Sequence, residues 1–68
     1  MDTMKRVQEL VSERNLSLYK LAQICGISYS TFKNTGKRNG QLTVDTIERI
    51  CKGLEIPMSE FFSEGVQL

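Results

Sequence analysis

Residues 16–34 read Leu-Ser-Leu-Tyr-Lys-Leu-Ala-Gln-Ile-Cys-Gly-Ile-Ser-Tyr-Ser-Thr-Phe-Lys-Asn, and this stretch decides the fold. Ser17 stands where a helix N-cap is expected, and Gly26 stands where an ending helix favours a residue at positive φ. Between them, apolar side chains recur at helical spacing and share one face: Leu18, Leu21, Ala22 and Cys25. The pattern predicts a short helix that ends at a glycine-centred turn.

A second helix is expected directly after this turn. Ser28 has the N-cap position, and Ile27 and Phe32 have the spacing of a hydrophobic staple, which would fix the angle between the helices. Two helices joined by a compact turn can seat one helix in the major groove of DNA. We therefore expect a helix–turn–helix over about residues 17–35, with a recognition helix over about 28–35. Its outward positions are Tyr29, Ser30, Lys33, Asn34 and Lys37.

The charges of the chain are segregated, although the net charge is only +1. No Asp or Glu occurs between Arg14 and Gln41, whereas residues 42–68 carry more acidic than basic side chains. A polyanion would be drawn to the middle of the chain and repelled by its C-terminal part. Ordinary surface charge is the alternative explanation. The basic residues of the acid-free stretch are Arg14, Lys20, Lys33, Lys37 and Arg38.

These residues resemble the helix–turn–helix domains of phage repressors and Cro, also called the XRE family. The first matching block comprises Leu16, Ser17, Leu21, Ala22, Gly26, Ile27, Ser28, Thr31 and Phe32. The second block runs from Thr43 to Ile47 and continues through Ile50, Leu54, Ile56, Phe61 and Phe62. The resemblance therefore covers nearly the whole chain. It implies an all-α, compact five-helix, lambda-repressor-like DNA-binding domain.

Three features depart from the family pattern. Leu18 stands where the family often has a Gln that touches a phosphate. The family's frequent Arg–Glu pair would fall on Val11 and Gly36, so both partners are absent together and no buried charge is left unpaired. The connection over residues 35–42 lacks the usual Pro and fits the family in two registers. The sequence therefore leaves the end of the recognition helix open.

The remaining segments predict three supporting helices in one domain, residues 1–68. A first helix over roughly residues 3–14 carries the apolar stripe Met4, Val7, Leu10 and Val11. A fourth helix, capped by Thr43, carries the stripe Val44, Ile47, Ile50, Cys51 and Leu54. It should end near Glu55, because Pro57 cannot continue it. A fifth helix is expected over residues 57–62, with Glu60 in its first turn.

The sequence gives little support to catalysis, a cofactor or a membrane. It has no His, and Cys25 and Cys51 lie on apolar stripes at a spacing that is typical of neither a metal site nor a redox motif. We expect two buried thiols, with a reactive thiol as the less favoured alternative, and no enzyme activity, metal, cofactor or small-molecule ligand. No apolar run approaches transmembrane length, so we expect a cytoplasmic protein.

Groove chemistry suggests roles for the exposed side chains. Asn34 can bind adenine with two hydrogen bonds, Lys33 can donate to guanine, and Tyr29 can offer its ring to a thymine methyl or its hydroxyl to a phosphate. The expected base-contacting residues are Tyr29, Ser30, Lys33 and Asn34. The expected phosphate-contacting residues are Ser17, Thr31, Lys37, Arg38 and Asn39. Plain solvent exposure is the alternative for each of them.

A single small module reads few base pairs, so we expect a homodimer. Phe61 and Phe62 are the candidate interface, with one ring packing inward and the other forming an apolar spot; alternatively, both rings belong to the core. The main prediction is a sequence-specific transcriptional regulator that occupies an operator in double-stranded DNA. The alternative is an antitoxin-like or accessory protein-interaction module on the same scaffold, which Leu18 favours.

Overall fold

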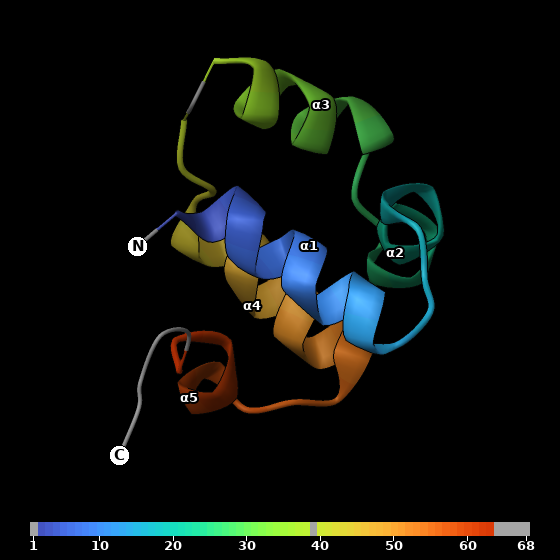
Figure 1. Ribbon diagram of the computed structural model, residues 1–68, viewed down its shortest axis with the longest axis vertical. Coiled ribbons are helices and arrows are strands. Elements are labelled where there is room, and N and C mark those ends of the chain that lie inside the picture. The colour runs from blue at the N-terminus through green and yellow to red at the C-terminus, as the bar shows by residue number, and fades with distance from the viewer. Residues whose placement is uncertain (1, 39, 64–68) are drawn as a thin grey trace.

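The computed structural model describes residues 2–38 and 40–63, which form five helices and no strand (Figure 1). This part of the chain therefore confirms the all-α architecture that the sequence predicts. The helices are α1 (Thr3–Glu13), α2 (Leu18–Cys25), α3 (Tyr29–Lys37), α4 (Val44–Leu54) and α5 (Met58–Phe61).

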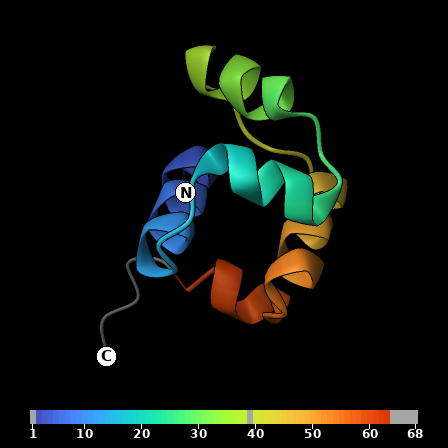
Figure 2. The same cartoon turned by 90° about the vertical axis from the view of Figure 1, so that its right-hand side faces the viewer.

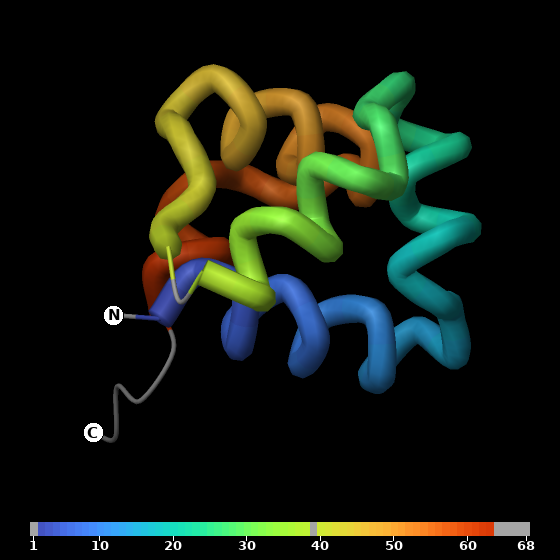
Figure 3. Tube along the Cα trace, turned by 90° about the horizontal axis from the view of Figure 1, so that it is seen from above, coloured from blue at the N-terminus to red at the C-terminus, as the bar shows by residue number. Residues whose placement is uncertain are grey.

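Helix α2 is the centre of the arrangement, since it packs against α1, α3 and α4. Figure 2 shows α1 and α4 on opposite sides of the domain, whereas α2 and α5 occupy the other two sides. Helix α3 lies outside this group, at the top of Figure 1, and it lies in front of the other helices in Figure 3. The recognition-helix candidate and α5 are therefore at opposite ends of the molecule.

The core receives side chains from all five helices and from the α3–α4 connection. Its buried apolar members are Met4, Val7, Leu10, Val11, Leu21, Ala22, Phe32, Leu42, Ile47, Ile50, Cys51 and Phe61. The two outer helices each insert one large aromatic ring, Phe32 from α3 and Phe61 from α5. Val44 departs from the prediction: it is the first residue of α4 and is 65% exposed.

Local capping follows the sequence closely. The hydroxyl of Ser17 accepts from the N–H of Lys20 at 3.0 Å, and that of Thr43 accepts from the N–H of Thr46 at 3.2 Å. Gly26 ends α2 at φ 68°, the left-handed conformation that its position predicts. Ser28 has the predicted N-cap position of α3 but makes no side-chain cap, since its hydroxyl pairs with another side chain.

The packing of α5 against α1 depends on a buried arginine that the sequence did not single out. Arg6 Nε donates to the carbonyl of Phe61 at 2.8 Å, and Arg6 Nη2 donates to that of Glu60 at 2.7 Å. Carbonyls at a helix C-terminus lack intrahelical partners, and a cation there is favourable. α5 is shorter than predicted, Met58–Phe61, because Pro57 takes the N-cap position rather than the first turn.

The connection between α3 and α4 is tied to the start of α1. The N–H and hydroxyl of Thr3 both donate to Gln41 Oε1, at 2.9 and 2.8 Å, and the N–H of Leu42 donates to the Thr3 hydroxyl at 2.8 Å. With Leu42 buried, this network fixes the register of the connection. Gly36 and Lys37 belong to α3, so the recognition helix is two residues longer than the predicted end at residue 35.

Candidate nucleic-acid interface

Helix α3 has one face toward the core and one toward solvent. Phe32 and Thr35 are buried, and they attach the helix to the rest of the domain. The side chains predicted to point outward are all exposed: Tyr29, Ser30, Lys33, Asn34 and Lys37. The four expected base-contacting residues are therefore brought together on one accessible helical face. The helix supplies an amide, a hydroxyl, an ammonium group and an aromatic ring, a set that can match base edges in a groove.

The N-terminal ends of α2 and α3 meet through two aromatic side chains. The rings of Tyr19 and Tyr29 are edge to face, with centroids 5.7 Å apart and an interplanar angle of 63°. The ammonium group of Lys33 lies over the Tyr29 ring, 6.0 Å from its centroid. Tyr19 was not predicted as a site residue, because sequence spacing indicated only that it lies off the apolar stripe of α2. Its proximity to Tyr29 depends on how the turn folds.

The expected phosphate-contacting residues lie at both ends of the helix–turn–helix. Ser17 is exposed at the start of α2; its cap uses an oxygen lone pair, which leaves the O–H able to donate. Thr31 is half-buried in the first turn of α3. Lys37 and Arg38 are exposed at the end of α3, where Arg38 Nε donates to the carbonyl of Asn34 at 3.4 Å. Asn39, the remaining expected contact, lies outside the described residues.

Arg14 does not belong to this basic surface, contrary to the expectation from its place in the sequence. Its guanidinium lies 3.3 Å from the Glu60 carboxylate on α5 and 3.6 Å from that of Glu13. α5 is at the end of the molecule opposite α3 (Figure 1), so Arg14 lies away from the predicted recognition face. The basic side chains left on the helix–turn–helix and its C-cap are Lys20, Lys33, Lys37 and Arg38.

Leu18 and Val11, two of the positions that depart from the family pattern, are used in packing. Leu18 is half-buried and packs against the core, and Val11 is a core residue. Gly36, the other half of the missing ion pair, is exposed, and a Cβ built on it meets no atom within 4 Å. Among the described residues, every buried side-chain nitrogen and oxygen has a hydrogen-bond partner. Apolar packing therefore replaces the missing polar groups at two of these three positions.

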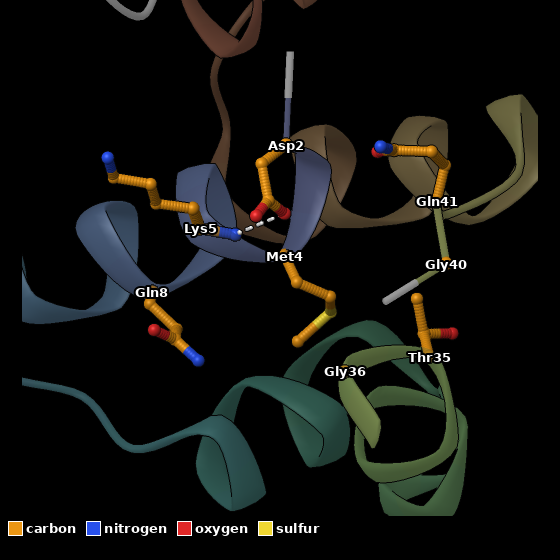
Figure 4. Close-up of a pocket in the computed structure, with 8 residues that line it drawn as sticks. All are labelled: Asp2, Met4, Lys5, Gln8, Thr35, Gly36, Gly40 and Gln41. Carbon is orange, nitrogen blue, oxygen red and sulfur yellow. Dashed lines mark hydrogen bonds between the residues drawn. The ribbon is translucent and has the colours of Figure 1, made fainter. Parts of the chain in front are cut away.

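A shallow hollow of about 490 Å³ lies between the start of α1 and the end of α3 (Figure 4). The Met4 side chain extends toward Gly36 across it, whereas Lys5 points away. The carboxylate in the lining, that of Asp2, accepts from the N–H of Lys5 at 3.2 Å as the N-cap of α1. The single carboxylate among the lining residues is therefore already used as a helix cap.

Of the two thiols expected to be buried, that of Cys51 is buried, whereas Cys25 is half-buried and packs against the core. Burial, and secondarily the neighbouring Cys51, raise the pKa of the Cys25 thiol. Burial, and then the carboxylates of Glu48 and Glu60, raise the pKa of the Cys51 thiol. A raised pKa lowers the fraction of thiolate, the reactive form. Over residues 2–38 and 40–63, no three acidic, His or Cys side chains cluster as metal ligands would, and no helix is long and apolar enough to cross a bilayer.

The two phenylalanines proposed for a dimer interface have different environments. Phe61 is fully buried (0% exposed), so its ring is not available to a partner, and its prediction as an interface residue is wrong. Phe62 is 46% exposed, and its ring packs edge to face against Phe61 with centroids 5.1 Å apart. One ring packs inward and the other forms an apolar spot, which is one of the alternatives that the sequence left open.

A capped helix, a left-handed glycine turn and an exposed second helix thus form a helix–turn–helix within five helices. The family model described as "Cro/C1-type HTH DNA-binding domain" matches residues 6–63 of the chain. The chain belongs to this family. The match confirms the resemblance to phage-repressor and Cro-type domains, and it assigns the chain a DNA-binding domain. Neither the comparison with curated proteins nor that with solved structures gave a match.

Proposed function

We propose that the chain is a sequence-specific transcriptional regulator that occupies an operator by placing α3 in the major groove. The observation that carries the proposal is the outward face of α3, where Ser30, Lys33 and Asn34 are exposed together. No carboxylate occurs on α2, on α3 or in the turn between them, so no like charge opposes the approach of phosphates.

The proposed contacts divide into base reading and backbone positioning. Asn34 would read adenine with two hydrogen bonds, Lys33 would donate to guanine acceptors, and Ser30 and Tyr29 would contact neighbouring base edges. Phosphates on either side would be bound by Ser17, Thr31, Lys37, Arg38 and Asn39. Ser17 precedes the base-reading residues in the chain, Thr31 lies among them, and the other three positions follow them. The positioning contacts would therefore set the depth and register of the helix.

We further propose that two copies bind one site as a homodimer through Phe62. The exposed ring of Phe62 is at the α5 end of the molecule, so pairing there leaves α3 uncovered. A two-fold dimer would read a pseudo-palindrome whose half-sites lie about 10 base pairs apart.

The alternative of a protein-interaction module rested on Leu18, which replaces a phosphate-touching Gln of the family. Leu18 packs against the core, so its apolar character has a structural reason and does not require a partner chain. We therefore retain one proposed function.

Selection of bound sequences from a random duplex pool tests the proposal directly. The expected result is one enriched motif with two-fold symmetry. Affinity for it should fall with salt at a log–log slope of about −2.7 per subunit, since Lys20, Lys37 and Arg38 would each neutralise one phosphate at roughly −0.9. Recovery of no motif, or affinity that does not change with salt, would contradict the proposal.

A further inference from the structure

The described surface has one place where two exposed aromatic side chains from different helices touch. Tyr19 of α2 is 53% exposed and Tyr29 of α3 is 43% exposed, and their ring centroids are 5.7 Å apart. Large apolar side chains that are exposed singly are ordinary, whereas contiguous exposed apolar surface is typical of interaction sites, and here two exposed rings adjoin. This pair lies at the N-terminal ends of the two helices of the helix–turn–helix.

The Tyr29 ring is held from two directions. The Tyr19 ring meets it at 63°, and the Lys33 ammonium lies over its face at 6.0 Å, one helical turn further along α3. Edge-to-face aromatic pairs and cation–π contacts both favour a fixed ring orientation. The pair is therefore ordered before any ligand binds, although nearly half of each side chain remains accessible. A surface of this kind loses little side-chain freedom on binding.

The chemistry of the pair points to an apolar group on the DNA. The apolar group that base pairs display in the major groove is the C5-methyl of thymine, and 5-methylcytosine carries the same group at the same ring position. Phosphates, by contrast, are anionic and bind basic side chains such as Lys20, which follows Tyr19 in the chain. Aromatic side chains make apolar contact with the thymine methyl.

We propose that Tyr19 and Tyr29 together form the contact surface for the C5-methyl group of a pyrimidine. Tyr29 makes the direct contact from the recognition helix, and Tyr19 of α2 extends that surface and fixes the ring. Tyr19 is then a specificity residue outside the recognition helix. This inference rests on the proposed function, because it names what one part of the same DNA-binding face reads.

The test uses the duplex recovered by selection, resynthesised with deoxyuridine at each thymine in turn and with 5-methylcytosine at each cytosine in turn. For the unaltered protein, removal of the contacted methyl should weaken binding about fourfold, the factor expected for one buried methyl-sized group. If the contacted base is a cytosine, its methylation should instead tighten binding by a similar factor. The two arms therefore distinguish a thymine from a methylcytosine as the source of the methyl.

Variants then assign the effect to the pair. Y29A should abolish the discrimination between methylated and unmethylated bases, and Y19A should reduce it. Y29F and Y19F should retain it, because the methyl contact uses the ring and not the hydroxyl. I24A is the matched control: Ile24 is an exposed apolar residue of α2 outside the pair, and its loss should leave the discrimination unchanged. Each ratio is measured within one variant, so a loss of folded protein cancels.

Equal affinity for thymine and deoxyuridine at every position, and for cytosine and methylcytosine, would overturn the inference while leaving the proposed function intact. The inference is also overturned if Y19A and Y29A both keep the full discrimination between methylated and unmethylated bases, or if Y19F and Y29F both lose it. Failure to bind any duplex would overturn the proposed function together with this inference.

Discussion

The two ends of the molecule are built in opposite ways. The α3 end attaches to the core through Phe32 and Thr35 and leaves its polar side chains in solvent. Helix α5 is less than half as long as α3, yet its last carbonyls are bound by the buried Arg6 of α1 and its Phe61 ring is fully enclosed. At one end the charged groups remain available to a ligand, and at the other they are used within the protein.

This difference shows that the position of a basic residue in the sequence does not reveal whether its charge is available to a ligand or is used within the protein. Arg14 is near the helix–turn–helix in the sequence but pairs with Glu60 on α5. Lys33 and Lys37, on the exposed face of α3, have no ion pair among those formed by the described residues. An arginine that holds two helices together contributes to stability, whereas an exposed lysine contributes to affinity for a polyanion.

The strongest test of the contrast lies at the C-terminal end of α5, where the last helical residue, Phe61, is enclosed and its C-cap neighbour, Phe62, is exposed. We expect F61E to unfold the domain, because loss of a buried Phe costs about 3–5 kcal/mol and a buried carboxylate costs more. F62E should keep its helical circular dichroism and thermal transition but sediment as a monomer. If F62E also unfolds, its ring is part of the core; if F62E remains a dimer, the interface lies elsewhere.

Replacement of Arg6 tests whether the α5 end depends on its internal cation. R6M leaves the carbonyls of Glu60 and Phe61 without their charged donor, so unfolding in urea should show a loss of about 1.5–3 kcal/mol. R14M is the control: it removes a partly exposed ion pair, worth less than about 1 kcal/mol. Neither change should alter the salt slope of DNA binding. A slope reduced by about one unit in R14M would place Arg14 on the DNA-binding surface after all.

Within the α3 end, base reading and phosphate binding should separate. N34A should relax the preference at one position of each half-site, at a cost of about 1–3 kcal/mol for the preferred base. R38A should weaken all sequences alike and reduce the salt slope by about one unit per subunit. A panel of single-base operator variants measures both effects, and identical behaviour of the two mutants would show that the assignment of α3 as the reading helix is wrong.

The smallest expected effects concern two helical glycines: Gly53 of α4, which is half-buried, and Gly36 of α3, which is exposed. A Cβ on Gly53 would lie 2.5 Å from Cys25 Sγ, so G53A should lose about 1 kcal/mol net in urea unfolding, as strain of roughly 1–3 kcal/mol outweighs the helical gain. G36A meets open space and should gain up to about 1 kcal/mol. The double variant C25A/G53A should be more stable than additivity predicts, and strict additivity would contradict the close contact.

The features that the sequence predicted correctly are local. The caps by Ser17 and Thr43 and the left-handed turn at Gly26 depend on residues within one helical turn, so spacing alone identifies them. The exposed face of α3 was predictable for the same reason, because helical periodicity separates Phe32 from Lys33 and Asn34.

The features that the sequence missed depend on long-range packing. Arg6 binds carbonyls 54 and 55 residues away, and Tyr19 meets Tyr29 only after the turn has folded. Phe61 and Phe62 are adjacent, so one inward and one outward ring could be expected, but which of the two is enclosed is set by how α5 docks. The end of α3 was open because the connection fits the family pattern in two registers. The position of the connection depends on a hydrogen bond between Leu42 and Thr3, residues that are 39 positions apart in the chain.

The tie between Thr3 and the connection has a consequence for the kinetics of hydrogen exchange. The first amides of a helix and the amides of a surface loop ordinarily exchange fastest, yet those of Thr3 and Leu42 both donate hydrogen bonds that close a segment of about 40 residues. They should exchange only when the α3–α4 connection separates from α1. The exchange rates of these two amides therefore report how often the segment that carries α2 and α3 opens. Binding of DNA should lower both exchange rates.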